Sequence, residues 1–248
     1  MGSEGYDDQF LAVQWAVANK IVTKLNAVRK VGCVAVAIEM ISRRIIGSGD
    51  SLAILHKHSP HDWMFDGISI LRNIYDVTLQ GLYIMSEPAK RDERAQLYLD
   101  FMDVERMKRI GLFDASDTDI AKHFSSSPKR PEAEPAIKQR FDAVKDRFMT
   151  KKGELRDYWY RGSLRDLAKA SGLEGEYELI QRLLSGVVHS SPLTLRDGPF
   201  LTRFFLLDCQ WRFAFRILGV YAEYKGIELD ETETALIGDA RANVFNLP

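Results

Sequence analysis

The chain has 248 residues, of which 46% are hydrophobic, so it can bury a full core in one large domain. Its formal net charge of −1 excludes the broad positive field on which non-specific nucleic-acid binding relies. The most apolar stretch, residues 200–224, is interrupted by Arg203, Asp208 and Arg212 before it reaches the roughly 18 uncharged residues of a membrane span. The first eight residues are acidic and polar, unlike a signal peptide, so we expect a cytoplasmic protein with no membrane partner.

Helical spacing of apolar residues dominates the chain, and neither sustained alternation nor an Asn-Gly or Asp-Gly turn indicates strands. We expect an all-α fold, a multi-helix and mainly antiparallel bundle with a helical and loop excursion at about 111–162. A long loop is predicted at 111–135, where serines and prolines cluster. Residues 1–248 are expected to form a single domain, because the apolar helices on either side of this polar middle each need cover. The expected helices lie at 8–30, 31–46 (with a continuation to about 56), 61–86, 89–110, 134–150, 163–171, 174–190, 199–225 and 230–242.

The cysteines and histidines give no clear metal site. Cys33 and Cys209 are far apart in apolar helical surroundings, which is typical of small buried hydrophobes in a reducing compartment. His56, His58 and His61 lie within six residues, but they lack the closed spacing of structural zinc. A short His/Pro loop entering a helix explains them, with metal binding as the alternative. We therefore expect no metal and no cofactor.

Arg72 and Asp76 are the most unusual residues of the chain. They lie one helical turn apart in a segment that is apolar nearly all round, and they project into the same arc as Phe65, Leu79 and Tyr83. Charged side chains inside such a helix need a reason. Either the two neutralise each other inside the fold, or they serve a functional site.

The expected helix at 174–190 carries a second polar group. Arg182 and His189 are two turns apart on one face, roughly 10 Å along the axis, close enough to converge on one phosphodiester. The alternative is a solvated stripe in which Glu178 pairs with Arg182 and Ser185 meets His189.

Residues 129–166 carry the local excess of positive charge, with eleven Lys/Arg against seven acids. Such an excess indicates a solvated helix face or an electropositive surface that binds RNA. Within it, the aromatic run 158–160 can stack bases or pack as core. The following segment imitates the start of a helix-turn-helix motif, but Glu174, Glu176 and Glu178 lie where a recognition helix would meet phosphates, so we expect no sequence-specific DNA partner.

The segments 71–76, 160–168 and 177–191 resemble the signature blocks of a bacterial, all-helical family of unknown function. That family typically has Arg-x-x-x-acid early, with glutamate more often than the Asp76 of this chain, and Ser-x-x-x-His late. More distantly, Arg182 with six residues before His189 is similar to the Arg-x(4 to 6)-His motif of the HEPN superfamily. HEPN proteins are helical bundles that include many dimeric ribonucleases of toxin and antiphage systems.

The HEPN resemblance implies a metal-independent endoribonuclease that acts as a homodimer in bacterial defence or toxin biology. His189 would be the general acid and base, and Arg182 would stabilise the developing phosphorane charge. Arg72 and Asp76 would orient the imidazole or the phosphate. The alternative is a non-catalytic helical interaction or scaffold protein, whose Arg/Asp/His cluster is structural or binds a partner.

Overall fold

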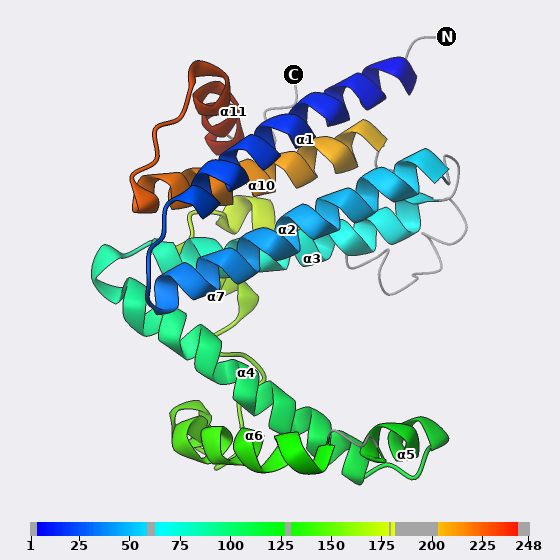
Figure 1. Cartoon of the computed structure of the whole chain (residues 1–248), viewed down its shortest axis with the longest axis vertical. Helices are drawn as coiled ribbons and strands as arrows, with labels where there is room; N and C mark the ends of the chain where they lie inside the picture. Colours follow the sequence, from blue (N-terminus) through cyan, green and yellow to red (C-terminus); the bar gives the residue numbers. More distant parts are fainter. Residues whose placement is uncertain (1–3, 59–62, 127–129, 179, 182–202, 243–248) are drawn as a thin grey trace. The chain divides into compact units, whose positions relative to one another are not determined.

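The computed structural model describes residues 4–58, 63–126, 130–178, 180–181 and 203–242. Within these ranges the regular elements are helices and no strand is present, which confirms the all-α class (Figure 1). In the same ranges, no helix is long and apolar enough to cross a membrane. The longer helices are α1 (Glu4–Ala27), α2 (Cys33–His58), α3 (Trp63–Met85), α4 (Arg91–Asp114), α5 (Asp119–Ser125), α6 (Arg130–Val144), α7 (Leu164–Ala170), α10 (Arg203–Lys225) and α11 (Glu231–Arg241).

The chain divides into two compact units, one formed by residues 1–89 with 162–248 and the other by residues 90–161. The second unit contains the predicted excursion and also α4. That all 248 residues form a single domain stays a prediction.

In the first unit, α10 packs against α1, α2, α3 and α11. The prediction that the long apolar helices at 61–86 and 199–225 share one bundle is therefore confirmed for α3 and α10, where the rings of Tyr75 and Phe213 lie 5.1 Å apart. The consecutive helices α1, α2 and α3 run antiparallel (Figure 1). Residues of α10 that are at most 2% exposed include Leu206, Leu207, Phe213, Ala214, Phe215, Ile217, Leu218, Tyr221 and Ala222.

Glycines let α10 approach its neighbours closely. A Cβ built at Gly49 of α2 would lie 2.2 Å from Nε2 of Gln210, and one at Gly81 of α3 would lie 2.7 Å from Cδ1 of Ile217. α2 runs unbroken through Gly47 and Gly49 to His58, so the predicted continuation of this helix past residue 46 is present. Gly49 does not end the helix, because its missing side chain serves the close packing against α10.

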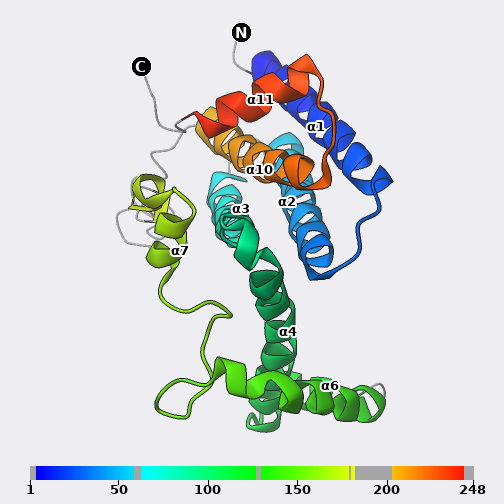
Figure 2. The same ribbon diagram turned by 90° about the vertical axis from the view of Figure 1, so that its left-hand side faces the viewer.

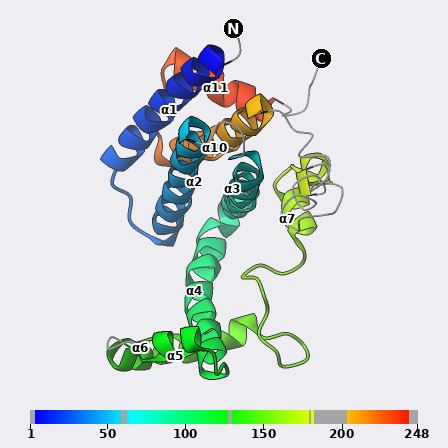
Figure 3. The same ribbon diagram turned by 90° about the vertical axis from the view of Figure 1, so that its right-hand side faces the viewer.

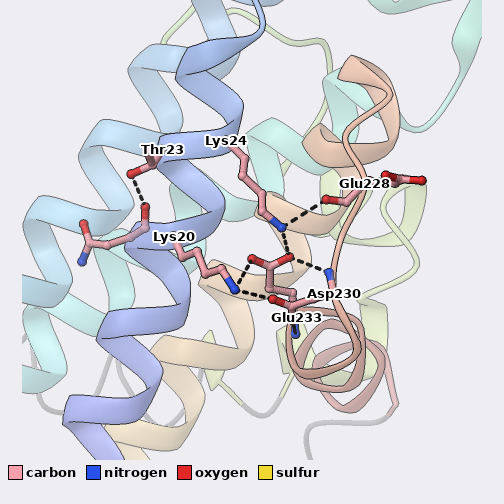
Figure 4. Close-up of polar contacts among 7 residues, drawn as sticks. Lys20, Thr23, Lys24, Glu228, Asp230 and Glu233 are labelled. Atoms are coloured by element: carbon pink, nitrogen blue, oxygen red, sulfur yellow. Dashed lines mark hydrogen bonds and ion pairs between the residues drawn. The ribbon is translucent and has the colours of Figure 1, made fainter.

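α11 lies beside α1 (Figure 2), and a buried carboxylate ties the two helices together (Figure 4). Asp230 caps α11 in a capping box with Glu233, whose side chain is only 1% exposed. Glu233 accepts a hydrogen bond from Nζ of Lys24 at 2.5 Å, and Lys20 bonds the carboxylate of Asp230. The N-terminus of α11 is thus fixed to the C-terminal part of α1 by two lysines.

In the second unit, α5 and α6 pack against α4 (Figure 3). Its apolar centre includes the rings of Phe101 and Phe148, 5.2 Å apart, and Phe148 is fully buried. The predicted loop at 111–135 is shorter than expected, because α4 extends to Asp114, α5 forms, and α6 begins at Arg130. The hydroxyl of Thr118 accepts from the backbone N–H of Ala121 at the start of α5, and Pro131 falls in the first turn of α6, where its missing N–H costs nothing.

Candidate functional site

Arg72 and Asp76 both lie on α3 and are half-buried. They do not form the neutralising pair that the first alternative requires, since no ion pair within 4.0 Å joins them in the described part of the chain. Oδ1 of Asp76 is buried and has no hydrogen-bond partner among the described residues. Within the described part of the chain, a buried carboxylate oxygen without a donor and a neighbouring arginine without an ion pair are a costly arrangement for a purely structural role.

Burial raises the pKa of Asp76 from its ordinary value of 3.8 to about 6, against the opposing effect of the positive charge of Arg72. The carboxyl therefore exchanges its proton close to neutral pH. That property is typical of groups that transfer protons in catalysis.

Tyr177, in the helical residues 174–178, is close enough to this pair for the charges of Asp76 and Arg72 to act on its phenol. Burial raises the pKa of Tyr177, as do the charges of Glu178 and Asp76, while Arg165 and Arg72 lower it. The preceding helix α7 packs against α3, and Oγ of Ser171 donates to the carbonyl of Leu79 at 3.4 Å. A phenol, a carboxyl and a guanidinium thus share one polar neighbourhood.

A buried ion pair anchors the 174–178 segment. Both oxygens of Glu176 accept from the guanidinium of Arg216 on α10, at 2.7 and 2.8 Å, and the two side chains are about nine-tenths buried. Arg216 also donates to the carbonyl of Ala240. At the surface of the segment, Arg165 pairs with Glu174 and Glu178 at 3.4 and 3.2 Å. Glu174, Glu176 and Glu178, the acids that argue against a DNA partner, therefore each have an ion-pair partner within the fold.

The Glu176–Arg216 pair was not predicted from the sequence. Its only signal is an arginine, Arg216, among the apolar residues of α10, the same kind of signal that drew attention to Arg72. The partner could not be found from spacing, because 40 residues separate the two.

The other two predicted site residues, Arg182 and His189, lie outside the described residues. The last described positions before them, 180 and 181, are helical. Whether Arg182 and His189 face the pair on α3 stays a prediction.

The described residues contain no group of three or more His, Cys, Asp or Glu side chains that could hold a metal ion. His56 and His58 end α2, whereas His61 is outside the described ranges. No disulfide joins Cys33 and Cys209. Cys209 is buried, which raises the pKa of its thiol well above the ordinary value, and Cys33 is partly exposed.

Much of the positive charge at 129–166 is neutralised. Arg140 and Arg147 pair with Asp103 and Asp100 of α4, and Lys138 and Lys145 share Asp142. Lys151, Lys152 and Arg161 are exposed and have no ion pair within the described ranges.

Two stacked tyrosines lie between Lys152 and Arg161 in the sequence. Tyr158, 51% exposed, stacks on Tyr160 with ring centroids 5.3 Å apart, while Trp159 and Tyr160 are buried. Nε and Nη1 of Arg156 are buried without partners, and burial together with the charge of Arg161 lowers the pKa of Arg156. The run 158–160 therefore contributes to the core and also presents one ring to solvent.

A family model described as a family of unknown function, DUF5677, matches residues 40–201, more than half of the chain. The chain belongs to the DUF5677 family. The match includes Arg72, Asp76, Arg182 and His189, and it confirms the resemblance to an all-helical family of unknown function. It does not extend to the HEPN superfamily. No curated protein and no solved structure matches the chain.

Proposed function

We propose that this DUF5677 protein is a metal-independent endoribonuclease, with Arg72 and Asp76 of α3 acting beside Arg182 and His189. The observation that carries the proposal is the environment of Asp76. This carboxyl has a pKa of about 6, and among the described residues its buried Oδ1 has no hydrogen-bond partner and the neighbouring Arg72 has no ion pair. The proposal also makes the protein a cytoplasmic homodimer of bacterial defence or toxin biology.

The chemistry needs no metal because RNA carries its own nucleophile. A 2′-hydroxyl attacks the adjacent phosphate, the P–O bond to the 5′-oxygen breaks, and the products are a 2′,3′-cyclic phosphate and a 5′-hydroxyl. His189 takes the proton of the 2′-hydroxyl and returns a proton to the leaving 5′-oxygen. Arg182 and Arg72 stabilise the extra negative charge on the phosphorane. Asp76 orients the imidazole by accepting its second N–H at the free Oδ1.

A second surface, on residues 90–161, is suited to hold the substrate. The exposed ring of Tyr158 offers a base a stacking partner, and Lys151, Lys152 and Arg161 offer unpaired charge to phosphates. Asp100 and Asp103 of α4 pair with Arg147 and Arg140, and Asp142 of α6 pairs with Lys138 and Lys145. RNA contact is therefore expected at Tyr158 and the unpaired cations of 129–166 and not along α6.

The test is cleavage of RNA oligonucleotides by the purified protein in EDTA. We expect cleavage with cyclic-phosphate ends, no cleavage of the matching all-2′-deoxy strand, and loss of activity in His189→Ala and Arg182→Ala. Unchanged cleavage in both variants would remove these residues from the mechanism. Absence of any cleavage by the folded wild type would favour the non-catalytic alternative, in which the cluster binds a partner.

A further inference from the structure

A cavity of about 550 Å³ lies between α1 and α2 in the first unit. It forms because α1 packs mainly on α10 and touches α2 little, while α2 packs on α3 and α10. Protein interiors are normally close-packed, with few voids larger than a water molecule. A space of this volume is in the range of small-molecule sites.

The walls of this α1/α2 cavity are aliphatic. Val22 and Leu25 come from α1, and Ile38 and Ile46 come from α2. The described lining residues include no aromatic ring. A nucleobase would therefore find no stacking partner here, whereas an alkyl chain would find apolar contact on both sides.

The polar rim is positively charged, with four cations and two acids. Arg43 is paired with Glu39 at 2.5 Å, and Asp50 accepts from Nε1 of Trp15 at 2.8 Å. Two lysines bond to backbone carbonyls at the C-terminal ends of helices. Lys225 donates to carbonyls at the end of α1, and Lys30 donates to a carbonyl at the end of α10. In the described ranges, Arg29 is the rim cation that makes no hydrogen bond or ion pair.

Ser42 adds a second donor with nothing to bond. It lines the cavity from α2, is only 8% exposed, and its Oγ has no hydrogen-bond partner in the part of the chain that the structure describes. Buried hydroxyls are normally satisfied, so this one points to an acceptor supplied from outside the chain.

We propose that the α1/α2 cavity binds an aliphatic carboxylate, with its carboxylate on Arg29, its chain between Val22, Leu25 and Ile38, and Ser42 donating to an oxygen of the same molecule. The site is separate from the proposed nuclease site on α3. Of its two helices, α1 lies wholly before the matched family region.

Isothermal titration of the full-length protein with decanoate, below its micellar concentration, tests the proposal. We expect saturable binding of one decanoate per chain, with affinity for decanol lower by about tenfold or more, because decanol lacks the charge-assisted bond to Arg29. Adenosine 5′-monophosphate, which has the anion but needs a stacking surface, should not bind. Equal binding of decanol would overturn the role of Arg29, and no saturable binding of decanoate would overturn the proposal.

Variants separate the site from general surface charge. Arg29→Gln should weaken decanoate binding about tenfold, whereas Arg44→Gln, which removes an exposed arginine of α2 outside the cavity, should leave it unchanged. Val22→Trp should fill the cavity and abolish binding. Ser42→Ala should weaken binding while leaving the melting temperature of the ligand-free protein equal or higher, since the lost hydroxyl bonds nothing within the fold. Equal losses in Arg29→Gln and Arg44→Gln would contradict the proposal.

Discussion

Replacing Asp76 by asparagine removes a charge that the fold penalises. Burial raises the pKa of Asp76 to about 6, so the folded state holds the proton more tightly than the unfolded chain, whose carboxyl titrates near 3.8. The stability that the protonated carboxyl contributes is present in full below pH 3.8 and is lost as the pH rises through 6. Above that pH, the folded protein carries an ionised carboxylate in a poorly solvated place.

The magnitude follows from the two pKa values. Their difference, at about 1.4 kcal/mol for each pKa unit, corresponds to about 3 kcal/mol. Asp76→Asn keeps the size of the side chain and removes its charge. We therefore expect the variant to be more stable than the wild type by up to about 3 kcal/mol at pH 8, and nearly equal to it at pH 4.

Urea denaturation of both proteins at several pH values between 4 and 8 measures this difference. Asp66→Asn is the matched control, because Asp66 is an exposed acid in the first turn of the same helix, and its effect should be small. The reasoning would be refuted if Asp76→Asn were less stable than the wild type by several kcal/mol at pH 8. That result is expected when an ionised Asp76 compensates Arg72 in a buried structural pair, and removal of one partner leaves the other uncompensated.

Three further predictions concern the anchors of the fold and the RNA surface. Glu233→Ala should lower the free energy of unfolding by about 1–2 kcal/mol, since α11 loses its capping box and the partly exposed Lys24 loses its partner, whereas the exposed Glu231→Ala should have little effect in the same denaturation assay. Glu176→Gln should also cost about 3–5 kcal/mol, because the buried Arg216 is left uncompensated, and an unchanged melting curve would show that water reaches this pair. Tyr158→Ala should weaken binding of single-stranded RNA by about 1–3 kcal/mol in fluorescence anisotropy without changing thermal stability, and equal affinity would exclude stacking on this ring.

The helices of the first unit could be predicted from the sequence because their apolar residues repeat at helical spacing. The prediction was less precise where the decisive contact comes from another part of the chain. α2 illustrates this. Gly47, Ser48 and Gly49 are compatible with either the end or the interior of a helix, and the close approach of Gln210 to Gly49 explains why they lie in its interior. α5 has only seven residues and starts on side-chain caps, so its periodicity was too short to stand out.

The candidate site was found from the sequence in part. Arg72 and Asp76 could be identified because charge is rare in an apolar helix, and that signal is local. Whether the two side chains pair could not be predicted, because a spacing of one turn allows a salt bridge. The positions of the side chains show instead that Oδ1 of Asp76 is buried without a hydrogen-bond partner among the described residues. The Glu176–Arg216 anchor depends on a contact between distant segments, which no spacing rule predicts.

The most direct test of the central claim is the rate of RNA cleavage in EDTA by the wild type and by Asp76→Asn, measured together with their stabilities at the same pH. The account predicts that the variant loses activity by about 100-fold or more, the usual contribution of a group that supports proton transfer, while it unfolds no more easily than the wild type. Equal cleavage rates in the two proteins would contradict the account, as would a loss of activity that only follows a loss of folded protein.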